Sequence, residues 1–282
     1  MLRTGTTTFE CKSGYGLSTA RELRALQLAT ELQGIVSQVT TRTALLAHAI
    51  PDGYTSNTWM DEVEKMLPEA LEHTTALDIF VESIAFGLDD LDRMGTLAAK
   101  NGVNLRAHVE QFTTMRSVPV ALKHDARSLD HLSAIHPDDI APLAASETAA
   151  VLLPGAEFMG AEATAPARDL IDAGAIVVLS TDANPGTSPI CSLPLIVGLG
   201  VRRYDLSTRE ALLAVTLNAA YVLDLQRDLG SIELDKRADF VLLDCPAEHV
   251  AYRLGRNPVA AAFVGGEPAC VRPDAAWRIA ER

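Results

Sequence analysis

Apolar and polar residues follow two alternating patterns along the chain. Seven short runs rich in apolar or β-branched residues precede residue 183, and the segments between them carry apolar residues at helical spacing. The predicted strands are 5–11, 38–50, 76–83, 103–110, 126–135, 149–155 and 175–182. The predicted helices are 18–34, 56–74, 90–102, 112–123, 137–146, 163–174 and a longer helical region over 191–224. This alternation is typical of a parallel sheet with right-handed crossovers.

Polar side chains follow the carboxyl ends of most of these strands. They are Glu10, His48, Glu82, His108, His131 and Asp182. Active sites of (β/α)8 barrels lie at that face of the sheet. An open doubly wound sheet would instead bind its ligand at one switch point, and the chain has no G-x-G-x-x-G phosphate-binding motif after a strand. The pattern therefore favours an α/β fold, a TIM-like (β/α)8 barrel that lacks one strand.

The last part of the chain has a different pattern, with short strands and turns in place of helices. We expect the incomplete barrel to cover residues 1–225, and strands of a small β-sandwich with a tail to cover 226–282. Gly265 and Gly266 separate two of these strands, which predicts a hairpin.

Composition and charge exclude several classes of partner. The chain has 282 residues and a net charge of −13, so nucleic acid and anionic membrane surfaces are unfavourable partners. No signal peptide and no membrane span are expected. The four cysteines form no C-x-x-C pair, which is typical of reduced thiols in a cytoplasmic protein.

His108 and Asp182 are the strongest candidates for chemistry. Asp182 ends the most apolar predicted strand, where an ionised carboxylate must be paired, hydrogen-bonded or metal-bound. The competing interpretation is that Asp182 caps the turn at the backbone N–H of Asn184. Imidazole and carboxylate from different strands suit Zn²⁺ or Fe²⁺. The chain has no H-x-H pair, so these are two ligands where catalytic zinc usually has three.

Four further residues or segments are candidates for the site, and two of them have two readings each. His131 is either a general acid/base or a structural residue, as a core histidine or as a partner for Asp130. His48 has the same two readings, and a hydrogen bond from its ring in the pocket would let it anchor a substrate. Tyr15, in the glycine-flanked segment "KSGYGL", would offer an aromatic face and a hydroxyl. The segment "NPGTSP" would form a rigid loop in which glycine allows close approach to a ligand.

Taken together, the segments "GTTTFECKSGYGL", "LLAHAIP", "RAHVEQF", "DHL", "LLPG" and "TDANPGTSP" resemble the imidazolonepropionase family of the metal-dependent amidohydrolase superfamily. They span about residues 5 to 190 in the order of the family, and "GSIELDKRADFVLLD" resembles the returning sandwich strands of the superfamily. Against the family pattern, the segment with the first barrel strand, its H-x-H ligands and a substrate-binding arginine is absent. The resemblance therefore implies an N-terminally truncated member whose barrel lacks its first strand.

The resemblance also implies roles for residues of this chain. His108 and Asp182 correspond to metal ligands, with one Zn²⁺ or Fe²⁺/Fe³⁺ ion per site. The residues that correspond to substrate-binding positions are Tyr15, His48, Gln111, Asn184, Gly186 and Thr187. Since a glutamine cannot act as a base, the catalytic acid/base falls to His131 or Asp182.

The implied activity is hydrolysis of the ring C–N amide bond of 4-imidazolone-5-propanoate to N-formimidoyl-L-glutamate in histidine degradation, by a metal-activated water. The resemblance implies a small-molecule substrate and is compatible with a homodimer in the cytoplasm. One alternative is a catalytically silent fragment that lacks the H-x-H ligands. A second is a related cyclic amidohydrolase or deaminase with a different substrate.

Overall fold

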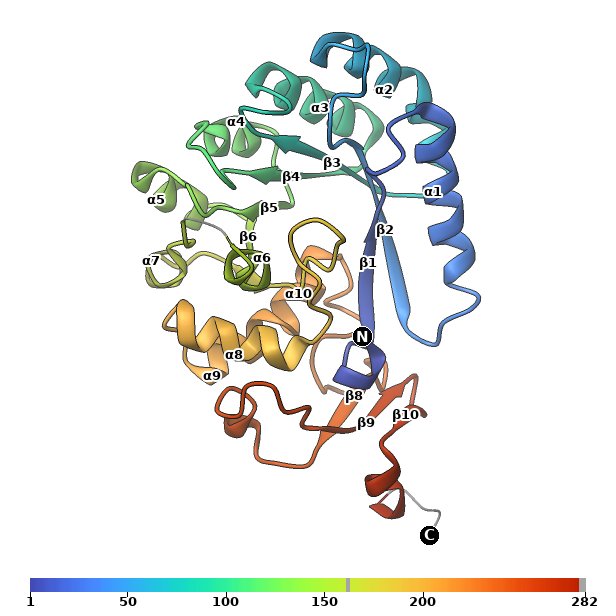
Figure 1. Ribbon diagram of the computed structural model, residues 1–282, viewed down its shortest axis with the longest axis vertical. Helices are drawn as coiled ribbons and strands as arrows, with labels where there is room; N and C mark the ends of the chain where they lie inside the picture. The colour runs from blue at the N-terminus through green and yellow to red at the C-terminus, as the bar shows by residue number, and fades with distance from the viewer. Residues whose placement is uncertain (161–162, 279–282) are drawn as a thin grey trace.

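The computed structural model describes residues 1–160 and 163–278, and its centre is one parallel sheet that curls into most of a barrel (Figure 1). The strands pair in sequence order from β1 to β7. Their bounds are β1 (Thr8–Lys12), β2 (Val39–Ala47), β3 (Ala76–Val81), β4 (Asn104–Val109), β5 (Ser128–His131), β6 (Ala149–Leu152) and β7 (Val177–Leu179). All six ladders are parallel, so the seven predicted strands and the α/β barrel-like fold are confirmed.

Helices cover the outer side of the curved sheet, as Figure 1 shows for the helices α1 to α5. In chain order the helices are α1 (Thr19–Leu32), α2 (Ser56–Ala70), α3 (Leu88–Asn101), α4 (Ser117–Lys123), α5 (Ile140–Ala144), α6 (Pro154–Phe158), α7 (Ala167–Asp172), α8 (Leu193–Arg203), α9 (Thr208–Ala214) and α10 (Leu217–Val222). None of the helices in the described ranges is long and apolar enough to cross a bilayer.

Local sequence explains where several helices begin and end. Thr55 and Thr58 form a reciprocal capping box at the start of α2, and the buried residues of α2 recur at helical spacing from Trp59 to Ala70. In α3 the carboxylate of Asp90 accepts the backbone N–H of Gly87, and Gly102 ends the helix in the left-handed conformation. The apolar faces of these helices pack against the sheet and form the main core.

One predicted helix is shorter than expected, one helix was not predicted, and one predicted helical region consists of several helices. The helix expected over 112–123 is only α4, because the carboxylate of Glu110 accepts the backbone N–H groups of Met115 and Ser117 and folds residues 110–116 into a loop. Helix α6 was not predicted from the sequence. The long helical region over 191–224 is three helices, and a capping box of Ser207 and Glu210 starts the second of them.

A small antiparallel sheet lies beside the open end of the curl, at the bottom of Figure 1. It pairs in the order β10-β9-β8, from β8 (Phe240–Leu243), β9 (Val259–Val264) and β10 (Glu267–Val271). The predicted turn at Gly265 and Gly266 joins β9 to β10, and both glycines have positive φ. The short 3-10 helix η1 (Leu2–Thr4) packs on this sheet, where Asn257 Nδ2 donates to the Arg3 carbonyl at 2.7 Å.

We expect the core between sheet and helices to provide most of the stability. Leu129 on β5 is fully buried, so Leu129→Ala should lower the free energy of unfolding by about 2–5 kcal/mol. Leu234 is 94% exposed, and Leu234→Ala should change the free energy of unfolding by less than about 0.5 kcal/mol. Urea unfolding followed by circular dichroism measures both variants, and equal losses would contradict this location of the core.

Candidate functional site

One cavity of about 540 Å³ lies inside the curl of the sheet and is lined by residues from the starts of strands, such as Thr8 and Ser128, as well as from their carboxyl ends. Every residue that the sequence assigned to the site lines this cavity: Tyr15, His48, His108, Gln111, His131, Asp182, Asn184, Gly186 and Thr187. Two of the six polar residues expected at strand ends behave differently. Glu10 lies in the middle of β1, and Glu82 turns its carboxylate toward a loop instead of the cavity.

A buried glutamate holds the loop that carries Tyr15. Glu22, at the start of α1, is 1% exposed, and its carboxylate accepts the backbone N–H groups of Gly14, Gly16 and Leu17 at 2.6–2.9 Å. His48 adds a contact between its Nδ1 and the Gly14 carbonyl at 2.9 Å. The Tyr15 ring therefore stands edge-on to the His48 ring, with the ring centroids 5.0 Å apart.

Gln111 lies on the loop that follows β4, and this loop is held in a similar way. The carboxylate of Glu82 accepts the backbone N–H groups of Phe112 and Thr113 at 2.9 and 3.2 Å, and also the Thr113 hydroxyl. Glu110 folds the rest of this loop back toward α4. Gln111 and Phe112 thus reach the cavity from a fixed backbone.

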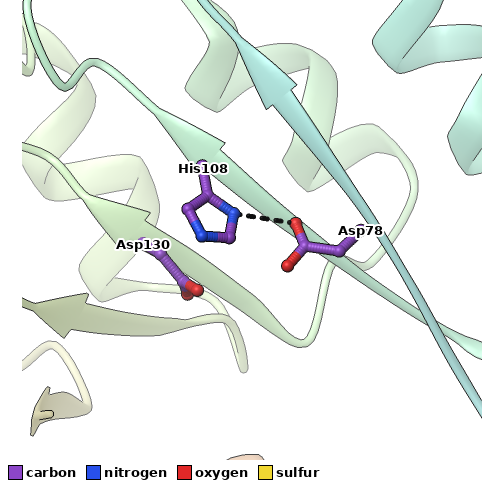
Figure 2. Close-up of side chains that lie close together, drawn as sticks. All are labelled: Asp78, His108 and Asp130. Carbon is purple, nitrogen blue, oxygen red and sulfur yellow. Dashed lines mark hydrogen bonds and ion pairs between the residues drawn. The ribbon is translucent and has the colours of Figure 1, made fainter. Parts of the chain in front are cut away.

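His108 is held from behind by a buried carboxylate, as Figure 2 shows. Its Nδ1 lies 3.0 Å from Asp78 Oδ1, and Asp78 is fully buried on the neighbouring strand β3. The Lys12 ammonium lies 2.6 Å from Asp78 Oδ2, 3.0 Å from Asp130 Oδ2 and 3.5 Å from Glu10 Oε2. Asp130 also accepts the Ser128 hydroxyl at 2.9 Å. These charges form one connected network inside the barrel.

The network sets the ionisation of its members. Burial raises the pKa of Asp78, but His108 and Lys12 outweigh it and hold that pKa well below its usual range. Burial lowers the pKa of Lys12, but the carboxylates of Asp130 and Asp78 hold it above its ordinary value. Burial likewise lowers the pKa of His108, and the charge of Asp78 raises it overall. Asp78 and Lys12 are therefore an ion pair.

His131 differs from His108 in having no carboxylate against its ring. Asp130, the partner in one structural alternative, is bound to Lys12 and Ser128 instead, and no hydrogen bond within residues 1–160 and 163–278 uses a ring nitrogen of His131. Burial, reinforced by the charge of His108, lowers the pKa of His131 to about 3. The ring lies 5.5 Å from that of His108, and its backbone has φ 80, a strained value at the cavity wall.

The loop after β7 leaves the Asp182 carboxylate available. Asn184 closes this turn, because its Oδ1 accepts the backbone N–H groups of Gly186 and Thr187 at 2.8 and 2.7 Å. Asp182 therefore does not cap the turn, which was its structural alternative. Burial raises the pKa of the Asp182 carboxyl, and the charge of His108 lowers it in part. No lysine or arginine in the described part of the chain forms an ion pair with Asp182.

Two sets of side chains compete as metal ligands. Asp78, His108 and Asp130 offer ligand atoms within 4.8 Å of one another, which makes a candidate metal site (Figure 2). The Lys12 ammonium, however, already lies against both of these carboxylates. His108 and Asp182 form the second set, and the Asp182 carboxylate has no basic partner there. On electrostatic grounds the second set fits a cation better.

The sequence reasoning missed the charged residues that hold the site in place. Asp78 and Asp130 lie on predicted strands and Glu22 on a predicted helix, whereas Lys12 follows directly after the predicted strand 5–11 and is the last residue of β1. A usable signal was present for Asp78, which is the one charged residue in the run "ALDIFV". Such a buried charge requires a partner. The partner itself comes from a strand more than sixty positions earlier, which no local pattern indicates.

Comparison with known families and curated sequences supports one assignment. The sequence profile of the amidohydrolase family matches residues 22–262. The imidazolonepropionase of Rubrobacter xylanophilus is 42% identical over 270 residues, which cover 94% of this chain and 65% of that protein. The imidazolonepropionase of Herpetosiphon aurantiacus is 40% identical over 274 residues, which cover 92% and 64%. The chain thus spans just under two thirds of the length of these relatives.

Solved structures agree on the fold. A zinc-bound adenosine deaminase from Xanthomonas campestris superposes with a TM-score of 0.70 at 16% identity, over 96% of this chain and 67% of the other. A triazine hydrolase variant gives 0.72 at 18% identity, over 93% and 67%. Guanine deaminase of E. coli gives 0.69 at 13% identity, over 96% and 72%. These likenesses are structural and extend to the curled sheet and its helices.

The contacts of Glu22 predict a measurable effect on the Tyr15 loop. Glu22→Gln removes the charge that three backbone N–H groups share, and should lower the free energy of unfolding by about 1–3 kcal/mol. Hydrogen exchange should become faster at residues 14–17. Glu31→Gln on the same helix is the control, since Glu31 forms only an exposed ion pair with Arg24. Unchanged exchange in the Glu22 variant would contradict the assigned role.

The low pKa of His131 makes the stability of the fold depend on pH. As the pH falls, the unfolded chain protonates this ring near pH 6.5, whereas the folded protein does so only near about pH 3. The neutral ring therefore contributes fully to the free energy of unfolding above about pH 6.5. Up to about 5 kcal/mol of this contribution is lost as the pH falls to about 3.

We expect His131→Asn to flatten the stability profile over this range, because asparagine does not titrate and tolerates positive φ. Urea unfolding at a series of pH values measures the difference. His249→Asn, at an exposed position, is the control and should leave the profile as it is. Parallel profiles for wild type and His131→Asn would show that burial does not hold the ring neutral.

Proposed function

The chain belongs to the amidohydrolase family, and from that premise we propose that it hydrolyses the ring C–N amide bond of 4-imidazolone-5-propanoate to N-formimidoyl-L-glutamate. The observation that carries this proposal is the convergence of all nine predicted site residues on one cavity. The identity of about 40% to imidazolonepropionases over most of the chain supports it. The substrate is then a small molecule that enters the cavity from the strand ends.

In the proposed site His108 and Asp182 hold one Zn²⁺ or Fe²⁺ ion. The donor set fits, since imidazole and carboxylate are ligands for both ions and the Asp182 carboxylate lacks another cation. When bound, the ion supplies Lewis acidity and lowers the pKa of a water. Family membership and the cavity support a metal, and the choice between zinc and iron is part of the proposal.

We assign proton transfer to His131. Its ring lines the cavity, and no hydrogen bond in the described part of the chain uses its nitrogens, so one of them is open to take a proton from the attacking water. As the water oxygen bonds to the ring carbonyl carbon and the C–N bond breaks, the same imidazolium returns the proton to the leaving nitrogen. Asp182 is the second candidate for this transfer. Gln111 has no titratable group, and we assign it to substrate binding.

The rim residues would hold and orient the substrate. Tyr15 and His48 offer adjoining aromatic rings and polar atoms on one wall of the cavity, suited to a flat heterocycle. In the loop after β7, the side-chain oxygen of Asn184 accepts two backbone N–H groups of the turn, so Asn184 contributes by shaping the loop. Gly186 lets a ligand approach the backbone, and the Thr187 hydroxyl lies 3.5 Å from the Asp182 carboxylate.

A competing proposal is that the chain is catalytically silent by itself. It is favoured by a specific observation: His108 and Asp182 are two donors, where catalytic zinc usually has three protein ligands. It would be supported if the chain neither retains metal nor opens the ring. A third possibility is that the true substrate is a related cyclic amide or an aminated ring. Incubating the chain with these compounds under the conditions of the activity test examines this possibility.

The activity test uses the purified chain with Zn²⁺ or Fe²⁺, and follows the addition of one water to 4-imidazolone-5-propanoate by mass spectrometry. We expect ring opening, with His131→Asn lowering kcat by about 10²- to 10⁴-fold because the proton acceptor is lost. Asp182→Asn should reduce both metal retention and turnover.

Asp205→Asn is the matched control for the aspartate, because Asp205 also has positive φ but is exposed and outside the cavity. Its rate should equal that of the wild type. Ring opening that survives in both His131→Asn and Asp182→Asn would contradict the assigned roles. A wild-type chain that retains metal but never opens the ring would contradict the proposed reaction.

A further inference from the structure

Asp78 lies close to the proposed metal ligand His108 but does not line the cavity. Lys12, His108 and Asp130 all lie on the cavity wall, whereas Asp78 is fully buried behind them. Its Oδ1 accepts the backbone N–H of Ile79 at 2.8 Å and lies 3.0 Å from His108 Nδ1. Its Oδ2 accepts from Lys12 Nζ at 2.6 Å. Both oxygens of Asp78 are thus committed to protein groups.

These contacts determine which nitrogen of His108 carries the proton. A neutral imidazole has one N–H donor and one acceptor nitrogen, and an ionised carboxylate only accepts. Nδ1 must therefore carry the hydrogen that points at Asp78, which leaves Nε2 as the acceptor nitrogen. Figure 2 shows the ring in this position, with Nδ1 toward Asp78 and the rest of the ring turned away from it.

We propose that Asp78 is the positioning residue of His108: it fixes the Nδ1–H form of the ring, so that Nε2 is the nitrogen that binds the metal. This inference rests on the proposed function, in which His108 is a ligand. Carboxylates that orient ligating histidines in this way typically change metal affinity about 10- to 100-fold when they are removed. Asp78 acts through His108 and does not itself touch the ion.

The alternative is that Asp78 is a ligand, in one site with His108 and Asp130. Lys12 argues against it, because its ammonium already lies between these two carboxylates and would repel a second cation placed there. The buried position of Asp78, off the cavity wall, argues in the same direction.

The chain contains a matched comparison on its surface. Asp92 contacts His124 at 2.9 Å and Lys123 at 2.6 Å, the same trio of side chains that Asp78, His108 and Lys12 form. There the contact is through Nε2 of the histidine, and His124 is outside the cavity. His124 should therefore show the opposite ring form, with the proton on Nε2.

The test is a long-range ¹H–¹⁵N correlation spectrum of the full chain without metal or substrate, at a pH where the rings are neutral. His108→Asn and His124→Asn identify the two sets of signals. We expect the Nδ1–H form for His108 and the Nε2–H form for His124. An Nε2–H form of His108 in the wild type would overturn the proposal, whatever the variants do.

Asp78→Leu then tests the cause. Lys12 keeps Asp130 and Glu10 as partners in this variant, so no cation is left unpaired. We expect His108 to lose its preference for Nδ1–H and the affinity for Zn²⁺ to fall about 10- to 100-fold. Asp92→Leu should change neither measurement. An unchanged His108 spectrum in Asp78→Leu would overturn the proposal.

The ring form is read without substrate, so this outcome is separate from the proposed reaction. A chain that never opens the imidazolone ring can still show the Nδ1–H form and its loss in Asp78→Leu. Conversely, a chain that opens the ring with His108 in the Nε2–H form would refute the positioning role alone.

Discussion

One ammonium group inside the barrel contacts three carboxylates on three strands. Lys12 on β1 contacts Glu10 of its own strand, Asp78 on β3 and Asp130 on β5. Charges in such a place are tolerated only when they are paired and hydrogen-bonded. Each carboxylate also has a second partner, such as Ser128 for Asp130. Because Asp78 in turn holds His108, the geometry of the candidate metal ligand depends on this ion pair.

Around the rim of the cavity, buried glutamates fix the loops by accepting hydrogen bonds from backbone N–H groups. Glu22 binds backbone N–H groups of the Tyr15 loop, and Glu82 and Glu110 bind those of the Gln111 loop. Glu157 accepts the Ala165 N–H at 2.9 Å and the Ser133 hydroxyl at 2.8 Å on a third side. Loops usually vary in conformation, and hydrogen bonds to their backbone N–H groups restrict that variation. The proposed binding residues are therefore supported on fixed backbone before a ligand arrives.

The sequence predicts the elements and the cavity residues well, because both depend on local pattern. Alternation of strands and helices is visible in single segments, and side chains at the ends of parallel strands meet at one edge. The residues that hold the site escape this reasoning. Whether Asp130 pairs with His131 or with Lys12 depends on the curvature of the sheet, and the extent of α4 depends on Glu110 turning back on its own loop. The first outcome follows from a contact between distant segments, and the second from a side chain that competes locally with the helix for backbone N–H groups.

The sequential strand order has a consequence for how the chain folds. Each ladder joins neighbours in sequence, such as Thr8 with Val39 and Ala150 with Val177, so each closes a short loop at a small entropic cost. The contact of Lys12 with Asp130 is different, since 118 positions separate the two residues and every strand between them must already be in register. The contacting residues are therefore close in sequence within the sheet and far apart in sequence at the ion pair inside it, and contacts of large sequence separation form late because they close long loops. The chain can assemble its strands in succession, while the charge network forms only when the curl is complete.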